Sequence, residues 1–534
     1  MIRAFLLATT LLAAAPAAAQ ELSADAAALK AHVAFLASDA MKGRDTGSNE
    51  IAIAEQYVAA QMLAAGLKPG GEKGGWLQAV PLINYKSADH GALTLKRGKK
   101  GETMVPLVWG KDYFARGNPQ IAKVAASGEV IFAGYGVVDK ASGYDDYKGL
   151  NVKGKIVAVL RDAPRHLNSD ARAHLGQPDE QARTAAEHGA VGVILIEGNT
   201  RHAVFPFAAT TGAWDRASMT WADAGAASRP NAPPFAYLGF DGAAKLFEGS
   251  KFKWADILAA DKEGKKLPRG ALGVSVEGTA NTTITRVAGN NVIGMLEGSD
   301  LKDQYVVISA HLDHVGIGRA DAKGDTIYNG AMDNAVGIGA MIEVARRFQA
   351  EGKKPRRSIL FVAVTAEEKG LVGSEYFAAN PSVPRGSIVA DVNLDMPILT
   401  YAFEDLVAVG ADHSSVGATV AAAAASEGVK VVPDPLPEEN FFVRSDHYSF
   451  VKAGIPSVSL DLGPGGPGGA AAKEFLEKHY HKPSDEIGLI DWTQGLRFVK
   501  LNHAIARALA DADERPTWNK GDFFGTLYKG PMAK

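Results

Sequence analysis

The pattern of hydrophobic and polar positions divides the chain into three stretches. In the first, up to about Gly66, apolar residues such as Leu29, Val33 and Leu36 recur at helical spacing, which predicts amphipathic helices. In the second, from about 118 to 275, short apolar runs alternate with turns, which predicts a smaller domain inserted into the main one. The elements expected in this insertion are strands at 129–138, 153–160 and 190–196 and a helix at 181–188.

In the third stretch, from about Ala288, continuous apolar runs alternate with helical patterns. The expected elements are strands at 305–310, 358–364, 387–394 and 456–460 and helices at 334–348 and 370–378. This alternation indicates a mainly parallel sheet with helices on both faces. We therefore expect an α/β fold with a mixed, mainly parallel sheet, interrupted by a smaller, β-rich α/β domain. The expected parts are 20–117 and 276–515 for the main domain, 118–275 for the insertion and 516–534 for a C-terminal tail.

The first 19 residues have the pattern of a secretory signal peptide. Arg3 supplies a positive charge, an apolar run follows, and three alanines end at Ala19, which is the small-residue signature of a cleavage site. No later apolar stretch reaches the length of a membrane span. We therefore expect export to a periplasm or the outside of the cell, as a soluble protein after cleavage.

Composition narrows the possible chemistry. The 534 residues include 57 Lys and Arg against 60 Asp and Glu, for a net charge of −3. This balance gives no basic excess of the kind that nucleic-acid binding requires, so no nucleic-acid partner is expected. The chain has no cysteine, which excludes disulfides, iron–sulfur clusters, thiolate zinc sites and a cysteine nucleophile. Any metal ion must be held by His, Asp and Glu.

Residues of these three types occur where the predicted strands of the third stretch end and in the loop before the predicted helix at 334–348. The candidates are His311, Asp313, Asp333, Glu367, Glu368 and Asp395. In open α/β sheets, ligands bind outside the carboxyl ends of the strands, so residues far apart in sequence can converge there. Imidazole and carboxylate together suit zinc, and also cobalt or manganese.

Local spacing suggests roles for some of these residues. Asp313 follows His311 by two positions and can accept the second ring N–H, which would fix the tautomer. Neighbouring side chains at a strand end point in opposite directions. Of Glu367 and Glu368, one can therefore bind metal while the other reaches a water on the metal. A further ligand is expected from the C-terminal part, where spacing alone does not choose among His447, His479 and His481.

Six motifs carry a family resemblance. They are AHLDH at 310–314, MDN at 332–334, TAEEKGLVGS at 365–374, NLDM at 393–396, RSDHYSF at 444–450 and YHKPSDE at 480–486. Together they resemble the co-catalytic di-zinc aminopeptidase family, which includes the Aeromonas and Streptomyces aminopeptidases and glutamate carboxypeptidase. The resemblance covers about 288–500. The inserted stretch looks like a protease-associated (PA) domain.

The resemblance implies a ligand set for two zinc ions. The implied ligands are His311 and Asp395 for one ion, Glu368 and His481 for the other, and Asp333 as the bridge. Glu367 would be the general base, and the peptide bond between Asp333 and Asn334 would be cis. Because His481 begins the H-x-P-x-D motif, the resemblance favours it over His447.

The donor for the developing oxyanion is not evident from the motifs. Some relatives use a Tyr shortly before the SDH motif, where this chain has Phe441, Phe442 and Val443. Arg444 and Tyr448 are the candidate replacements. His447 and Tyr448 would line or support the pocket.

By resemblance, the expected function is removal of N-terminal residues from peptides with a free N-terminus. A hydroxide activated by two metal ions would attack, with Glu367 as the general base. The alternatives are a carboxypeptidase, a one-zinc glutaminyl-cyclase-like enzyme and a receptor-like protein without catalysis. A carboxypeptidase would need clustered arginines to bind a carboxylate, and only Arg319, Arg385 and Arg444 lie near the motifs. The sequence gives no expectation for the oligomeric state.

Overall fold

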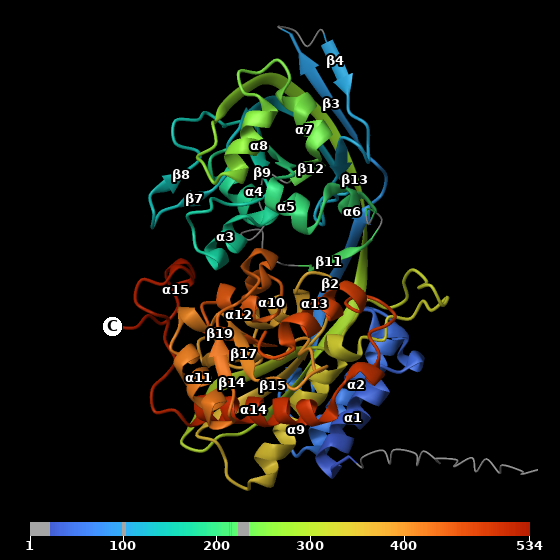
Figure 1. Cartoon of the computed structure of the whole chain (residues 1–534), viewed down its shortest axis with the longest axis vertical. Coiled ribbons are helices and arrows are strands. Elements are labelled where there is room, and N and C mark those ends of the chain that lie inside the picture. The colour runs from blue at the N-terminus through green and yellow to red at the C-terminus, as the bar shows by residue number, and fades with distance from the viewer. Residues whose placement is uncertain (1–21, 99–102, 213, 215, 223–233) are drawn as a thin grey trace, which may run out of the picture.

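The computed structural model describes residues 22–98, 103–212, 214, 216–222 and 234–534. The predicted signal peptide, 1–19, lies outside these residues. Within the described ranges, no helix is long and apolar enough to cross a bilayer. Two sheets organise the chain, and one long strand, β13 (Gly270–Leu296), runs through both of them (Figure 1).

The main sheet is mixed. Its order is β11 (Ser218–Trp221), β2 (Leu77–Ser87), β13, β15 (Arg357–Val364), β14 (Leu301–His311), β16 (Ile388–Asn393), β19 (Ser457–Leu462), β17 (Asp405–Val409) and β18 (Lys430–Val432), with the short β1 (Lys68–Pro69) also paired to β13. The four central strands β15, β14, β16 and β19 are parallel to one another. Every residue of β15 and β16 is buried, as expected for parallel strands covered on both faces.

Helices cover both faces of this sheet. One face carries α1 (Ala24–Leu36), α2 (Asn49–Ala64), α9 (Val336–Ala350), α11 (Val416–Ser426) and α14 (Trp492–Asp511), and the other carries α10 (Val372–Ala379) and α12 (His447–Lys452). On the second face, Phe377 and Phe450 pack against strand residues such as Val307 and Val362. The predicted fold class is therefore confirmed.

The second sheet lies beyond the main one along the long axis of the molecule (Figure 1). Its order is β4 (Thr103–Pro106), β3 (Ala92–Arg97), the first half of β13, β6 (Lys123–Phe132), β9 (Ile156–Leu160), β10 (Gly192–Ile196), β12 (Pro234–Leu238) and β5 (Tyr113–Ala115). The helices here are α3 (Ser169–Leu175), α4 (Pro178–Glu187), α5 (Asn199–Val204), α6 (Phe207–Gly212), α7 (Phe240–Phe247) and α8 (Trp254–Lys262). Strands β3 to β5 belong to this sheet although they precede residue 118.

One strand of this second sheet is shorter than the sequence pattern predicts. The apolar run at 129–138 continues past the end of β6 at Phe132. Gly134 and Gly136 both have positive φ angles there, which glycine adopts readily. The chain therefore turns, and Asp146 accepts hydrogen bonds from the backbone N–H groups of Tyr135 and Val137. A two-stranded ribbon, β7 (Val138–Asp139) and β8 (Tyr144–Asp145), follows.

The C-terminal residues pack on the main domain. Trp518 is buried and donates a hydrogen bond from Nε1 to the carbonyl of Gly454 at 2.8 Å. Phe524, in the short helix α15 (Phe523–Leu527), packs against Phe442, with 4.7 Å between the ring centroids. Helix α13 (Gly468–Lys478) precedes the segment that carries His481.

Candidate metal centre

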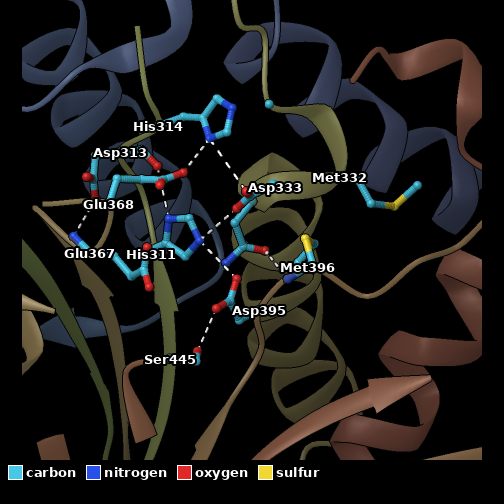
Figure 2. Close-up of polar contacts among 12 residues, drawn as sticks. His311, Asp313, His314, Met332, Asp333, Glu367, Glu368, Asp395, Met396 and Ser445 are labelled. Atoms are coloured by element: carbon cyan, nitrogen blue, oxygen red, sulfur yellow. Dashed lines mark hydrogen bonds and ion pairs between the residues drawn. The ribbon is translucent and has the colours of Figure 1, made fainter. Parts of the chain in front are cut away.

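Two groups of side chains that could hold a metal ion meet at the carboxyl ends of the parallel strands. The first group is His311, Asp333 and Asp395, and the second is His314, Asp333, Glu368 and His481. Within each group, one ligand atom from every residue lies within 4.8 Å of the others. The two groups share Asp333, as Figure 2 shows for the residues that it labels.

The first group is built around His311 at the end of β14. Its Nε2 atom lies 3.1 Å from Oδ1 of Asp333 and 2.9 Å from Oδ1 of Asp395. Its Nδ1 atom lies 3.0 Å from the backbone carbonyl oxygen of Asp313. This carbonyl, rather than the predicted Asp313 carboxylate, orients the ring and turns Nε2 toward the two acids.

The second group includes a residue that the sequence reasoning missed. His481 Nε2 lies 3.2 Å from Oδ2 of Asp333 and 3.0 Å from Oε2 of Glu368, as the motif resemblance implies. His314 Nδ1 lies 2.7 Å from Oε1 of Glu368 and 3.8 Å from Oδ2 of Asp333. His314 is fully buried, and its Nε2 atom has no hydrogen-bond partner in the described part of the chain. The last residue of the AHLDH motif therefore belongs to the site.

Glu367 lies beside the first group and lines the same pocket. Its backbone N–H donates to Oδ1 of Asp313 at 3.0 Å, while Oδ2 of Asp313 accepts from Thr46. Asp313 thus fixes the backbone that carries the candidate base. Burial raises the pKa of the Glu367 carboxyl well above its usual value; His311 opposes this shift, and Asp395 adds to it. A carboxylate with a raised pKa is a stronger proton acceptor.

Asp485 explains the acidic position of the H-x-P-x-D motif. Its two carboxylate oxygens accept the backbone N–H groups of Met332 and Asp333, at 2.9 and 3.0 Å. These contacts fix the loop that presents Asp333 to both groups. The peptide bond between Asp333 and Asn334 is cis, as the resemblance implies.

Arg44 joins the segments that carry the ligands. Its guanidinium is buried and donates only to backbone carbonyls among the described residues. The acceptors are the carbonyls of Leu36, Leu312, Asn329 and Gly330, at 2.6 to 3.1 Å. One side chain thus connects the end of α1, the loop after β14 and the loop before Asp333.

The RSDHYSF motif contributes to the site through its serine. Ser445 donates from Oγ to Oδ2 of Asp395 at 2.5 Å, and Oγ accepts from the side-chain amide of Asn393. Arg444 lines the pocket in front of the metal ligands, where it contacts Glu439 and the ring of Phe441.

The structure places His447 and Tyr448 away from the metal ligands. His447 is fully buried against Phe442, and neither ring nitrogen has a partner among the described residues. Burial lowers the pKa of His447 to about 3. The hydroxyl of Tyr448 contacts His174 of α3, so neither side chain lines the pocket in front of the ligands.

The donor set fits zinc. It combines imidazoles with carboxylates that are buried close together and would repel one another without a cation. Burial alone would raise the pKa of Asp333, but its hydrogen bond with His311 and the nearby His314 and His481 hold it well below the usual value. Asp333 is therefore held as the anion, the form of a carboxylate that can bind a metal ion.

A pocket of about 210 Å³ opens in front of the ligands. Much of its wall is apolar, formed by residues that include Ile398, Leu436, Phe441, Leu462 and Leu476. Tyr480 also lines it, and its ring stacks on His481 with 3.9 Å between the centroids. The pocket can therefore enclose an apolar side chain next to the metal ligands.

Two ligand groups that share one carboxylate, beside a separate carboxylate base, are typical of hydrolases that use two metal ions. Residues 291–506 match the family model described as Peptidase family M28. The matched segment contains every residue of both ligand groups and Glu367. The family resemblance predicted from the motifs is confirmed by this match.

Individual relatives are similar over shorter stretches. A probable zinc metalloprotease of Pyrenophora tritici-repentis is 31% identical over 155 residues, which are 29% of this chain and 34% of the relative. A probable glutamate carboxypeptidase of Arabidopsis thaliana is 30% identical over 215 residues, 37% of this chain and 29% of the relative. The chain thus spans about a third of the length of these curated relatives.

Among solved structures, the aminopeptidase from Aneurinibacillus sp. strain AM-1 aligns over 91% of this chain and 93% of its own. The sequence identity is 20% and the TM-score is 0.49.

Proposed function

We propose that the protein is a zinc metallopeptidase that acts as an aminopeptidase with two zinc ions. The observation that carries this proposal is the position of Asp333, which lies in both ligand groups while Glu367 remains outside them. The match to Peptidase family M28 and the zinc metalloprotease among the relatives support a peptide substrate and zinc. Cobalt or manganese can replace zinc with the same donor types.

The residues of the site have separate roles in peptide hydrolysis. Two bound zinc ions would supply a water of lowered pKa and polarise the scissile carbonyl. Glu367 accepts the proton of the attacking water and returns it to the leaving amine. Asp313 holds the backbone of Glu367 in place, and the raised pKa of the Glu367 carboxyl suits both proton transfers.

We assign Tyr480 as an oxyanion donor alongside Arg444. Both side chains line the pocket, and Tyr480 stacks on His481. Tyr448 is engaged with His174 instead. Tyr480→Phe would lower kcat by about 100-fold, in the range found when one such donor is removed, with bound zinc unchanged.

The pocket also limits the substrate. Its apolar wall favours a peptide that begins with an apolar residue, and the acids Glu367 and Asp395 on the same pocket attract its α-ammonium group. N-acetylation removes this charge and should abolish cleavage.

The test uses the zinc-loaded chain and matched peptides that begin with Leu or Asp, each unblocked or N-acetylated. We expect free leucine from the unblocked leucine peptide, slower release of aspartate, and no release from either acetylated peptide. Release from the C-terminal end of acetylated peptides would instead indicate a carboxypeptidase. Cyclisation of N-terminal Gln with one zinc per chain would indicate a cyclase, and a metal-free chain without turnover would indicate a binding role.

We further propose that the protein is exported, on the basis of the signal-like pattern of residues 1–19. The second sheet is proposed to be a PA-like domain that covers or restricts the cleft. N-terminal sequencing of protein from cell fractions tests the proposed export. A mature chain beginning near Gln20 outside the cytoplasm supports it, and an intact N-terminus inside the cell contradicts it.

A further inference from the structure

A second pocket, separate from the metal ligands, lies between the second sheet and the strands β2 and β11 of the main sheet. Its volume is about 260 Å³, and it is lined by four arginines: Arg116, Arg161, Arg201 and Arg216. Lys86 adds a fifth basic side chain, and no Asp or Glu lines the pocket among the residues that the structure describes. The sequence reasoning looked for clustered arginines only near the metal-site motifs, and these four residues are spread from 116 to 216.

The topology explains how the arginines meet. Strands β9, β10 and β12 are parallel neighbours. Arg161 comes directly after β9, Arg201 lies in α5 just after β10, and Tyr237 is near the end of β12. The carboxyl edge of parallel strands is where open α/β sheets bind ligands, so the pocket has the position of a binding site.

Polar atoms on this pocket are buried without a partner. Among the residues that the structure describes, they are Nε of Arg201 and Oγ1 of Thr210, while the Tyr237 hydroxyl lies within hydrogen-bond reach of Arg161 and Arg201. Tyr237 is only 1% exposed, and the Arg161 guanidinium lies 5.8 Å from the centroid of its ring. Burying polar groups without hydrogen bonds costs free energy, which a ligand with several oxygen acceptors would recover.

The positive charges of the pocket have no acidic partner among its described lining residues. Burial lowers the pKa of Arg161, and the neighbouring charges of Arg201 and Arg116 lower it further. Arginine stays protonated in proteins, so these like charges repel one another in the folded chain. The buried Glu197 is the acid that acts on Arg201, and it already accepts from the backbone N–H of Phe207 at 2.6 Å.

We propose that this pocket binds an anionic group with several oxygens, a carboxylate or a phosphate. The arginines provide charge-assisted hydrogen bonds, and Tyr237 and Thr210 provide neutral donors. The group has two sources: a free anion from solution, or the C-terminal carboxylate of a peptide. The second source is consistent with the position of Arg201, which is close enough to Arg444 on the metal-ligand pocket for the two charges to interact.

The first experiment titrates inorganic phosphate into the full-length, metal-free chain by calorimetry, so its result does not depend on peptidase activity. We expect saturable binding that weakens about tenfold or more in Arg161→Gln and in Arg201→Gln, because a charge-assisted hydrogen bond is lost. Tyr237→Phe, which keeps the ring, tests the hydroxyl in the same way. Arg286→Gln, on the exposed surface of β13, is the matched control and should bind phosphate like the wild type.

The second experiment separates the two sources by comparing KM for a short peptide with a free C-terminus and for the same peptide with a C-terminal amide. If the pocket holds the peptide carboxylate, wild type favours the free acid and Arg161→Gln removes the preference. If it holds a free anion, the two peptides are equivalent and phosphate binding remains. The proposal is overturned if phosphate does not bind and the two peptides are equivalent, or if Arg161→Gln changes neither result.

Discussion

Asp333 lies between two imidazoles, with its Oδ1 atom 3.1 Å from Nε2 of His311 and its Oδ2 atom 3.2 Å from Nε2 of His481. One carboxylate thus serves both ligand groups. Asp333→Asn replaces one of the two oxygens by an amide nitrogen that cannot bind zinc. We expect zinc content to fall from about two ions per chain to one or fewer, measured after equilibrium dialysis. Asp303→Asn, an exposed control on β14, should retain the full content.

Glu367 has a role that can be separated from metal binding. Because it lies outside both ligand groups, Glu367→Gln should keep zinc content unchanged while kcat falls by about 10²–10⁴-fold, the range for loss of a general base. Steady-state kinetics and elemental analysis of one preparation provide the two readings. Loss of zinc from Glu367→Gln would show that Glu367 is a ligand. Glu72→Gln, at an exposed position, serves as the control.

His314 belongs to the second ligand group through its contact with Glu368. Replacing His314 removes either a zinc ligand or the side chain that orients the ligand Glu368. We therefore expect His314→Ala to weaken binding of the second zinc by about 10–100-fold, measured by competition with a chelator. The first zinc should be unaffected, as should both ions in His166→Ala, whose side chain is exposed in the loop between β9 and α3. Equal affinity in His314→Ala and wild type would exclude this role.

Asp485 should support the site without touching the metals. Asp485→Ala leaves the backbone N–H groups of Met332 and Asp333 without their acceptors. Leaving buried donors unsatisfied costs about 1–3 kcal/mol each, so we expect a lower free energy of unfolding in urea. Asp485→Asn keeps one acceptor oxygen and should be intermediate. A variant as stable as wild type would contradict this account of the H-x-P-x-D motif.

A buried histidine connects the second sheet to the C-terminal residues. His413 lies 2.9 Å from Asp170 of α3 and 2.6 Å from Asp522, and the aromatic rings of Phe442 and Phe524 pack around it. Burial alone would lower the pKa of His413, but its hydrogen bonds with the two carboxylates raise it to about 9. The imidazolium therefore stabilises the fold fully below about pH 6.5 and loses this contribution as the pH rises through about 9.

Urea unfolding at about pH 6 and about pH 10 measures whether the stability falls as the pH rises through the pKa of His413. We expect wild type to lose about 1–3 kcal/mol more stability between these values than His413→Gln does, as the size of the pKa shift implies. The comparison with the variant removes contributions from other titrating groups. An identical pH dependence in both proteins would contradict the assigned contact.

The parts of the structure that follow from local pattern were predicted from the sequence. The strand expected at 358–364 is β15 at Arg357–Val364, and Glu367 and Glu368 follow it at the sheet edge, because a buried apolar run and its polar end are visible in one segment. His314 was missed, since its role depends on Glu368 from the neighbouring strand. Likewise, the contact of Tyr448 with His174 depends on α3, which comes from a distant part of the sequence.

The pocket lined by Arg116, Arg161, Arg201 and Arg216 was also not predicted from the sequence. Arg161 and Arg201 belong to different strand-to-helix connections, and only the parallel pairing of β9 with β10 brings them to one edge. No residue spacing in the sequence predicts that β9 pairs with β10. Long-range strand order, rather than local propensity, therefore decides which charged residues become neighbours.

Anomalous diffraction at the zinc edge, from crystals of the zinc-loaded protein, tests most directly whether Asp333 joins two zinc ions. We expect two peaks that share Asp333, one beside His311 and Asp395 and the other beside Glu368 and His481. A single peak, or two peaks without Asp333 between them, would contradict the proposed two-zinc centre.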